Sequence, residues 1–586
     1  MAIPPKTSNS SRRFTLLRSI ILLCHLVLIL DMGMAQGIGD VNPYNNKRVE
    51  EVRIRIVNPS NDSIFNQRIE DKVRQDLKIF PDNKFSRNHV EFSLSMSRRD
   101  PRIASTLVEL EFGSTGGVIV LVYVTLGESV GGPSQKGFLI SKSIKDLPKL
   151  YDSGSTFARL KLETLGIHYS NTDAWYGRPV ELLQGNPLVD GKPSGEGYED
   201  WVEGFVHLGA YGITPLYKNL HFYGGLSAIV SGSAGQELFT DESRAYVGLE
   251  DAYVGLITGK TWENGNRLVF NTSVGRQRYT LGDGFLIVNT SANGSDRAAL
   301  QSNPRWAADM LARASLKYNN NVLEFFYLDP DELPVVDSKT GILGLNIEAK
   351  PATNLSVGAS YLYVPKSDFG YFTTTETFSR EGLRVIDARF RWNSAPPGHS
   401  GIFLAGEGGI QTNKNFPMEA YGYFGEVGWN FSELPWTPTI SYRHARFSGD
   451  DPNTTRFERW DPLLSGGTGE QWVQGINHFK VVQISNVVAH RFQLRLRPKP
   501  KLELVPQFWL FRADSRTNLG GNPALSFLNS KDYGVEGNLT FKIFLSRKIF
   551  IQGHVAATFP GDAVQIPSVQ NIDNWWSTML FIRYAL

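Results

Sequence analysis

The clearest shortage in this 586-residue sequence is cysteine, which occurs once, as Cys24. A single cysteine excludes an internal disulfide and a cysteine-ligated metal site. Cys24 lies in a segment with the features of a secretory signal peptide, in which basic residues at 12–18 precede an apolar core at 20–30. We therefore interpret residues 1–35 as a cleaved signal peptide and expect the mature chain to contain no thiol.

Long apolar runs and a net charge are missing as well. Beyond the signal peptide, no run reaches the roughly eighteen apolar residues that a membrane helix needs. The mean hydropathy of −0.23 is nevertheless compatible with a membrane β-barrel, because each strand turns apolar side chains outward only at every second position. With 60 basic and 58 acidic residues, the net charge favours no partner and gives no reason to expect nucleic acid.

The end of the sequence, residues 574–586, has a strongly alternating pattern. Successive side chains of a strand point to opposite faces, so one face is apolar and the other carries a charge. The apolar face consists of Trp576, Thr578, Leu580, Ile582 and Tyr584, and the other face of Ser577, Met579, Phe581, Arg583 and Ala585. In a bilayer the open edge of such a strand needs a partner, and the first strand of the same sheet supplies one. We predict that this segment closes an outer-membrane β-barrel.

Residues 155–586 divide into eighteen candidate strands, an even number typical of bacterial outer-membrane barrels. Short connections, such as 216–218 and 498–500, alternate with long ones, such as 171–199 and 447–475. Short turns at one end and long loops at the other are typical of this class. The predicted fold class is an all-β transmembrane antiparallel β-barrel of about eighteen strands, preceded by a small α+β periplasmic domain.

That preceding domain is predicted at residues 36–128. Apolar residues recur every four positions from 65 to 77, which indicates a helix, and two strands follow an ambiguous segment, at 106–112 and 118–125. The order β-α-(α)-β-β resembles a POTRA domain, a periplasmic module attached to several outer-membrane barrels. The resemblance implies a second helix and a protein partner in the periplasm, whereas a plain spacer packed against the barrel mouth is the alternative. Residues 129–154 are interpreted as a linker.

Within the barrel segment, charged residues share one face of a strand and apolar residues the other. Arg491 and Arg495, for example, alternate with Phe492 and Leu494. An arginine that faces lipid at the bilayer centre costs roughly 2–4 kcal/mol, so we expect these charges to face the interior. The pore-lining residues predicted in this way are Arg159, Lys161, Asp309, Arg313, Lys317, Asp387, Arg389, Arg391, Arg443, Arg491, Arg495 and Arg583. An excess of guanidinium groups favours anions, although pairs of opposite charge that only support the wall are the alternative.

Two arginines do not fit this parity. Arg276 and Arg278 share the face of Leu268 and Phe270, which are apolar. We expect either that the two arginines lie beyond the hydrocarbon of the membrane or that a β-bulge at Gly275 switches the phase of the strand.

Several segments resemble a known family. YVGLEDAYVGLITGK at 246–260, LVFNTSVGRQRYTLGDGFLI at 268–287 and ISYRHARFSGDDPNTTRFERWDPLL at 440–464 resemble the alginate export family of outer-membrane porins. The resemblance implies an eighteen-stranded barrel with an electropositive lumen that passes an anionic polysaccharide such as alginate. By position it marks Arg276, Arg278, Arg443, Arg446, Arg456 and Asp461 as pore-lining or substrate-binding residues. The short turn at 545–548 departs from the family, because it leaves no room for a long plug loop.

The predicted function is therefore an outer-membrane channel that passes an anionic polysaccharide or acidic sugars. A general anion or sugar porin is one alternative, and a POTRA-containing barrel for protein translocation or membrane assembly is another. No motif places a serine beside a histidine and no metal-ligand spacing stands out, so we expect no enzyme activity, no cofactor and no metal site. The expected partners are outer-membrane lipid, the anionic solute and a periplasmic protein. The expected location is the bacterial outer membrane, with the N-terminal domain in the periplasm.

Overall fold

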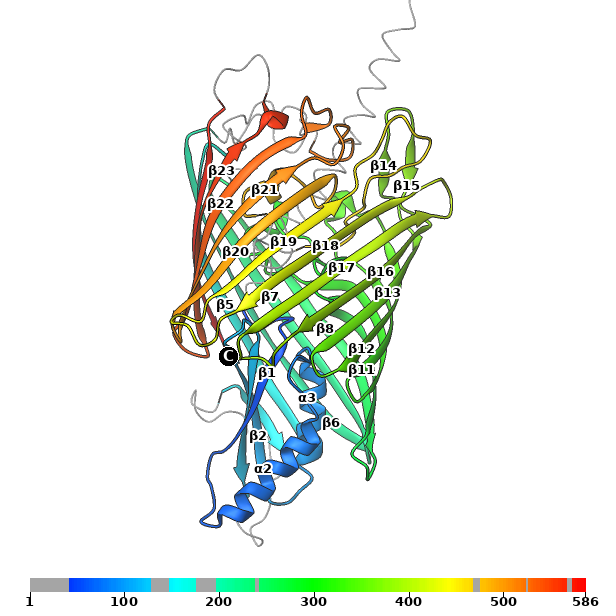
Figure 1. Cartoon of the computed structure of the whole chain (residues 1–586). Coiled ribbons are helices and arrows are strands. Elements are labelled where there is room, and N and C mark those ends of the chain that lie inside the picture. The colour runs from blue at the N-terminus through cyan, green and yellow to red at the C-terminus, as the bar shows by residue number, and fades with distance from the viewer. Residues whose placement is uncertain are drawn as a thin grey trace, which may run out of the picture.

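The computed structural model describes residues 42–127, 147–174, 196–237, 242–466, 475–522, 525–565 and 572–586. The predicted signal peptide lies outside these residues, as does most of the predicted linker. The described chain forms a barrel of long tilted strands with a small domain of helices and strands at one end (Figure 1). No helix among the described residues is both long enough and apolar enough to cross a membrane.

The N-terminal domain has the predicted order of elements. They are β1 (Val49–Ile56), α2 (Ser63–Leu77), α3 (Arg87–Ser97), β2 (Ile103–Phe112) and β3 (Val118–Leu126). β3 lies at the centre of the sheet, parallel to β1 and antiparallel to β2. The small α+β domain is thus confirmed, and the ambiguous segment forms α3, whereas the assignment as a POTRA domain stays a prediction.

This domain has a hydrophobic core of its own. α2 begins after Asp62, whose carboxylate accepts hydrogen bonds from the N–H groups of Ile64 (3.0 Å) and Phe65 (3.1 Å). The buried residues of α2 are spaced three or four positions apart and pack with α3 and the inner face of the sheet. The domain therefore has a hydrophobic core separate from that of the barrel.

Eighteen antiparallel strands form the closed barrel, which confirms the predicted class and number. β24 pairs with β5, from Trp576 opposite Thr172 to Ala585 opposite Glu163, so the last strand closes the barrel as predicted. A further short strand, β4 (Lys149–Ser153), lies within the predicted linker and pairs with the start of β5. The barrel strands are β5 (Thr156–Thr172), β6 (Tyr198–Tyr217), β7 (Leu220–Gly235), β8 (Arg244–Thr261), β9 (Arg267–Arg278), β10 (Ala307–Tyr318), β11 (Asn321–Asp329), β12 (Gly341–Ala352), β13 (Leu355–Lys366), β16 (Leu383–Asn393), β17 (Gly401–Asn413), β18 (Ala420–Asn430), β19 (Thr439–Phe447), β20 (Val487–Lys499), β21 (Leu502–Arg512), β22 (Asp532–Phe544), β23 (Ile549–Pro560) and β24 (Trp575–Ala585).

The two ends of the barrel differ in their connections. At the turn end, short connections such as 218–219 and 500–501 join neighbouring strands. At the loop end the connections are long, notably the β9–β10 loop (279–306) and the β19–β20 loop (448–486). Short elements within the loops are η3 (Ser295–Arg297), η4 (Pro334–Val336), β14 (Gly370–Phe372), β15 (Thr377–Ser379), α5 (His478–Val481) and η6 (Asp562–Val564).

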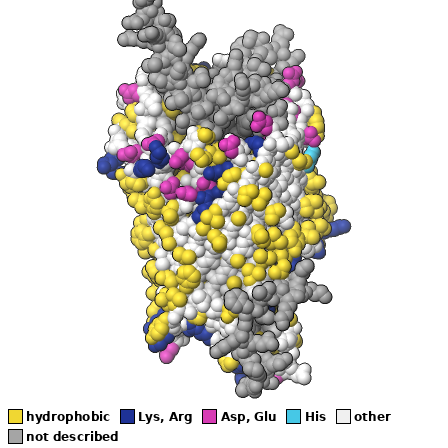
Figure 2. Space-filling view, turned by 180° about the vertical axis from the view of Figure 1, so that it is seen from behind, with side chains coloured by type: hydrophobic (Ala, Val, Ile, Leu, Met, Phe, Trp, Pro, Cys, Tyr) yellow, Lys and Arg dark blue, Asp and Glu magenta, His cyan; other side chains and the backbone are white. Residues whose placement is uncertain are grey.

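The wall of the barrel is apolar outside and largely polar inside. On β20, Phe492 is 50% exposed and Arg491 only 1%. On β24, Leu580 and Ile582 are exposed, whereas Arg583 is buried. On the face drawn in Figure 2, the exposed apolar side chains form a band across the barrel, and most charged side chains lie toward its ends. Such a band is the surface that an outer-membrane barrel turns to the acyl chains.

The β9–β10 and β19–β20 loops fold back into the barrel and fill much of it at the loop end. Residues of both loops join inward-facing wall residues in one hydrophobic core. The ring centroid of Phe285, in the β9–β10 loop, lies 5.7 Å from those of both Phe447, on the wall, and Trp460, in the β19–β20 loop. The sequence indicates long outer loops here but not that they turn inward.

Candidate functional site: a charged lumen closed at both ends

Most of the predicted pore-lining bases lie on the inner face of the wall, and many of them are next to a carboxylate. Four such pairs, with their nitrogen–oxygen distances, are Arg313 with Glu324 (3.2 Å), Arg583 with Glu163 (2.6 Å), Lys161 with Asp251 (2.5 Å) and Arg389 with Asp387 (2.7 Å). Arg391 lies with its guanidinium 5.4 Å from the ring centroid of Phe403. Lys317 lines a small cavity near the turn end together with His89 and Arg267.

Halfway up the wall, one acid lies between two bases. Glu426, Arg443 and Arg491 are cross-strand neighbours on β18, β19 and β20. Arg491 donates to one carboxylate oxygen of Glu426 at 2.6 Å, and Arg443 Nε donates to the other at 2.9 Å. Planar guanidinium groups hold a carboxylate in this manner in many anion sites. The group keeps one positive charge in excess.

A chamber of about 360 Å³ lies between the wall, the N-terminal domain and the end of the β9–β10 loop. Its lining has seven basic and five acidic side chains, so positive charge is in excess there. Four predicted residues meet at this chamber, namely Arg159, Lys161, Arg278 and Arg583. Aromatic faces from Phe157, Tyr211, Tyr253 and Trp306 complete it, and the Arg278 guanidinium lies 4.1 Å from the Trp306 ring centroid. Cations beside flat apolar faces suit a ligand that is both anionic and ring-shaped.

A β-bulge in β8 turns two neighbouring acids inward. The register slips between Leu226 and Ala228 of β7, so that Glu250 and Asp251 together oppose Ser227. Asp251 accepts from Lys161 and from Ser227, both at 2.5 Å. Glu250 accepts from the backbone N–H groups of Trp306 (2.7 Å) and Ala307 (2.9 Å). Both acids thus line the chamber, and Glu250 also fixes the end of the β9–β10 loop.

A second bulge, in β10, corrects the prediction for Asp309. The register slips between Ala308 and Leu311, opposite Arg276, and Asp309 points outward with its side chain 65% exposed. Asp309 therefore does not line the pore, because the extra residue breaks the alternation on which the prediction depended. The bulge expected at Gly275 lies instead in this neighbouring strand.

Arg276 lies at the loop end, where it bonds to Asp309 at 2.7 Å and to Asp331. Asp331 also accepts from Arg297 (3.0 Å) and Arg305 (2.6 Å). Burial raises the pKa of Asp331, but the three guanidinium groups lower it by more. The pKa of Asp331 is therefore below its ordinary value. Arg276 thus helps to anchor the loops, consistent with a position beyond the hydrocarbon.

The signature residues of the β19–β20 region serve different purposes. Arg446 lies on the outward face of β19, opposite in parity to Arg443, and pairs with Asp514 at 2.8 Å. Arg456 is exposed beside Glu419. Neither therefore faces the pore as predicted, because Arg446 follows the outward parity of β19 and Arg456 lies on the surface of a loop.

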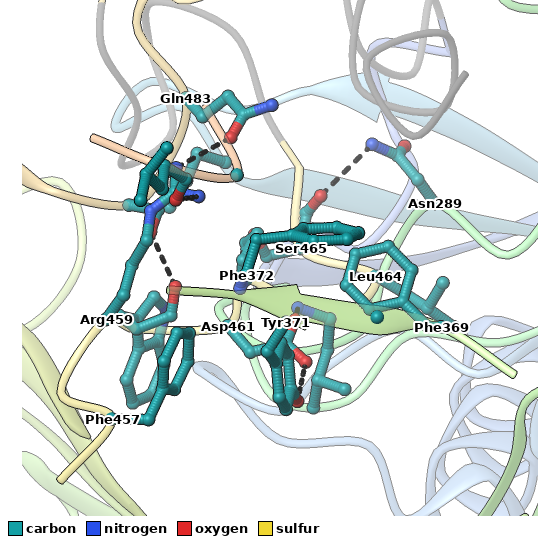
Figure 3. Close-up of a pocket in the computed structure, with 18 of the residues that line it drawn as sticks. Asn289, Phe369, Tyr371, Phe372, Phe457, Arg459, Asp461, Leu464, Ser465 and Gln483 are labelled. Carbon is teal, nitrogen blue, oxygen red and sulfur yellow. Dashed lines mark hydrogen bonds between the residues drawn. The ribbon is translucent and has the colours of Figure 1, made fainter. Parts of the chain in front are cut away.

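Asp461 lies beside Tyr371 (Figure 3) and is buried at the centre of a hydrogen-bond network. Its carboxylate accepts from Arg380 at 2.8 and 3.0 Å, from the Leu463 N–H at 2.8 Å, and from the Tyr371 hydroxyl. Gln411, on the wall, bonds to the Asp461 backbone on both sides. These bonds hold the β19–β20 loop inside the barrel, so the role of Asp461 is to position this loop.

Two further wall carboxylates hold the loops from below. Glu536, on β22, accepts the N–H groups of Ile476 (2.5 Å), Asn477 (3.0 Å) and His478 (3.0 Å). Glu203, on β6, does the same for the N–H groups of Gln301 and Ser302 in the β9–β10 loop. The loop end is therefore sealed by loops whose backbones are bonded to the wall.

The turn end is covered by the N-terminal domain. Its hydrogen-bond and ring contacts include those with Arg159 on β5, Tyr211 on β6, Gly265 between β8 and β9, Arg267 on β9, Lys350 on β12, Arg495 on β20 and Phe544 on β22. These partners are spread around the mouth of the barrel. Within the described part of the chain, no group of three or more His, Cys, Asp or Glu side chains could hold a metal ion.

Sequence reasoning missed Glu203, Glu250 and Asp251 as residues of the interior. Glu203 lies on a strand with clear alternation, so its parity alone would have placed it inside. The adjacent acids Glu250 and Asp251 gave no such signal, because in a regular strand one of them would face lipid.

The closed antiparallel barrel, its apolar outer band and its charged lumen define an outer-membrane channel. The family model described as "Alginate export" matches residues 229–576, and the chain belongs to this family. No curated protein matches the sequence.

The chain also resembles solved structures of other bacterial proteins. OccAB2 of Acinetobacter baumannii is 11% identical, with a TM-score of 0.42 over 73% of this chain and 98% of that chain. The outer membrane protein OprD of Pseudomonas aeruginosa is 12% identical, with a TM-score of 0.43 over 73% of this chain and 93% of that chain. These likenesses concern the architecture of the barrel alone.

Proposed function

We propose that this channel passes an anionic polysaccharide, alginate-like, or its acidic sugar units through the arginine-bearing lumen. The observation that carries the proposal is the set of inward guanidinium groups that already hold carboxylates, above all Arg443 and Arg491 on Glu426. A uronate presents the same carboxylate chemistry to these groups. The turn end would face the periplasm and the loop end the outside.

Transport by exchange follows from this arrangement. A solute carboxylate that reaches one base displaces a wall carboxylate, and the next base along the lumen offers the next equivalent position. Each contact must stay weak, because a site that binds tightly stalls flow. The roles of Arg159, Lys161, Arg313, Lys317, Arg389, Arg391, Arg495 and Arg583 in this pathway are part of the proposal. No catalytic step is needed, and we infer that the protein is not an enzyme.

The size of the chamber favours small acidic sugars as a second candidate. A volume of about 360 Å³ holds one or two sugar rings and not a polymer, as long as both ends stay closed. Block of the channel current by oligomeric alginate, compared with block by the uronate monomer, separates the two. Stronger block by the oligomer supports a polymer pathway, and equal block supports a porin for single sugars.

Ion selectivity in planar bilayers tests the proposal. The open channel is expected to prefer anions, and the combined variant Arg389→Gln, Arg391→Gln, Arg491→Gln and Arg495→Gln is expected to lose most of this preference. The control neutralises four bases that lie outside the lumen, the exposed Arg384, Arg456 and Arg512 and the half-buried Arg446. A cation-preferring channel, or equal effects of the two variants, contradicts the proposal.

A further inference from the structure

We infer that the N-terminal domain is an autoinhibitory plug that a polyanion displaces, because it occupies the anion-binding groups at the turn end of the lumen. The inference rests on the proposed function, since the displacing ligand is the solute class named there. It concerns a second step, the opening of the channel, which the selectivity of the pore does not determine.

Helix α3 is the part of the domain that enters the mouth. Phe92 packs against inward-facing wall residues, in a small core with Phe157, Ile213, Tyr223, Ile257 and Val269. Its ring lies 5.1 Å from that of His221, edge to face. The same helix buries polar residues against the wall, and Ser95 Oγ donates to the Ser155 carbonyl at 2.6 Å. A helix buried on nearly all sides, with serines toward the barrel, is shaped for docking in a polar lumen.

The β2–β3 turn penetrates the lumen on the other side of the domain. Arg495, a predicted pore residue, donates to the Thr115 carbonyl at 3.5 Å, and Gly116 leaves no room for a Cβ beside that guanidinium. Phe112 stacks on Phe544 with ring centroids 4.2 Å apart, and the Arg497 guanidinium lies 4.4 Å from the Phe112 centroid. The domain therefore fills the space through which a solute would leave or enter.

The barrel bases that face the domain bind its oxygen atoms. Arg159 donates to the Thr106 carbonyl at 2.8 Å, and Lys350 donates to the Pro81 carbonyl at 2.7 Å. Arg547 bonds to Glu109 and, at 2.8 Å, to Glu111. In the docked state Arg159, like Arg495, holds an oxygen of the domain in the way that we propose it holds a uronate, and Lys350 and Arg547 hold further oxygens at the mouth. An entering polyanion and the plug thus compete for the same bases.

A latch joins the plug to the β9–β10 loop. Asp283, at the tip of that loop, lies 3.1 Å from Lys84 and 3.6 Å from Arg48 of the N-terminal domain. Lys84 also donates to the Gly282 carbonyl. Burial raises the pKa of Asp283, but Lys84 and Arg48 lower it well below its ordinary value, so the latch stays charged at neutral pH. The two seals meet at this point, and release of the plug also frees the loop tip.

Charge reversal tests the latch. Asp283→Lys removes two partly exposed ion pairs, and the open probability in planar bilayers is expected to rise about five- to thirtyfold. Adding Arg48→Glu and Lys84→Glu to Asp283→Lys reverses both sides and is expected to restore closure. Asp296→Lys, at an exposed position of the same loop, is the control and leaves the open probability unchanged. Equal effects of Asp283→Lys and Asp296→Lys overturn the latch.

Thiol accessibility in the full chain, with Cys24→Ser, tests displacement itself. Ser95 is fully buried against the wall, whereas Val73 is fully buried in the domain's own core. Oligomeric alginate at about ten times its Kd is expected to speed labelling of Ser95→Cys about tenfold, and neutral dextran is expected to leave it unchanged. Val73→Cys stays protected throughout, because the domain undocks as a folded unit.

Each outcome decides the matter. Unchanged labelling of Ser95→Cys overturns the inference, and so does faster labelling of Val73→Cys, which reports unfolding. If labelling is unchanged while the channel prefers anions, the plug mechanism falls and the proposed function stands. If alginate speeds labelling while the channel prefers cations, the plug stands and the anion pathway falls.

Discussion

The loop end and the turn end of this barrel are closed by different means. At the loop end, loops of the barrel itself fold inward, and their apolar residues merge with the wall into one core. At the turn end, a separately folded domain with its own core rests in the mouth. Its attachment combines two small apolar contacts, one around Phe92 and one between Phe112 and Phe544, with hydrogen bonds and ion pairs to wall bases.

The difference indicates which seal can open. Moving the loop-end seal exposes apolar surface and strips loop N–H groups of the acceptors Glu203 and Glu536, each loss costing about 1–3 kcal/mol. Moving the turn-end seal breaks some buried contacts, such as Arg98 with Asp152, but also several partly exposed ion pairs, such as those of Arg547 and Asp283. The partly exposed pairs are worth about 0–1 kcal/mol each, and an anionic solute can replace them. The loop end therefore acts as part of the fold, and the turn end as the reversible closure.

The largest effect is expected for Glu536→Ala. Three buried N–H groups of the β19–β20 loop lose their acceptor, so the free energy of unfolding falls by roughly 3–5 kcal/mol. Thermal and denaturant unfolding in detergent measure this loss. Glu419→Ala, an exposed acid at the same end, is the control and is expected to stay within about 0.5 kcal/mol. Similar losses for both variants would remove the distinction between the two seals.

A smaller effect is expected for Phe92→Ala at the turn end. Truncation of this buried ring weakens docking by about 3 kcal/mol, while the barrel keeps its own stability. The mean current through single channels should rise, with little change in the unfolding temperature of the barrel. Phe65→Ala, on α2 and outside the contact with the wall, is the matched variant. A loss of barrel stability for Phe92→Ala equal to that of Glu536→Ala would show that both ends belong to one fold.

The smallest expected effect is a pH dependence of docking, since two groups on α3 oppose each other. Burial raises the pKa of Glu91 to about 7, so the docked state holds this proton more tightly and docking weakens as pH rises from about 4.5 to 7. Burial, with Lys317 and Arg267 nearby, lowers the pKa of His89 well below 6.5, so docking weakens as pH falls below that value.

Single variants separate the two groups. Glu91→Gln leaves only the histidine, and its open probability should rise on acidification below about pH 6.5. His89→Asn leaves only the acid, and its open probability should rise from about pH 5 to pH 7. Bilayer recordings between pH 5 and 8 compare the slopes, which must have opposite signs. Slopes of the same sign would mean that α3 does not control the closure.

The alternation of side chains predicted the barrel well. It gave eighteen strands, the closing role of residues 574–586 and the inward face that carries Arg491 and Arg583, because one buried polar face and one lipid face leave a period of two in every strand. The pattern failed at two β-bulges, each of which adds one residue to a strand. At the bulge in β10 the prediction for Asp309 was wrong, and at the bulge in β8 the inward position of Glu250 and Asp251 was not predicted. A bulge depends on the neighbouring strand, so a single strand carries no sign of it.

The two seals could not be predicted from local pattern. The loop residues that enter the barrel, such as Phe285 and Leu464, lie in polar, glycine-rich surroundings typical of surface loops. Likewise, α3 has apolar residues on the face that packs in its own domain, and its docking face is made of serines, Glu91 and Phe92. A face of this composition is compatible with water, so the sequence does not mark it as a binding surface. Its contact with the wall depends on the shape and charge of the barrel mouth.

The account depends most on the claim that the N-terminal domain closes an otherwise anion-conducting lumen. The direct test inserts a protease site between residues 127 and 147 of the full chain and records the bilayer current before and after cleavage and washing. The account predicts a rise in current after the domain leaves, with a reversal potential that indicates anion preference. An unchanged current after complete removal of the domain, or a preference for cations, would contradict it.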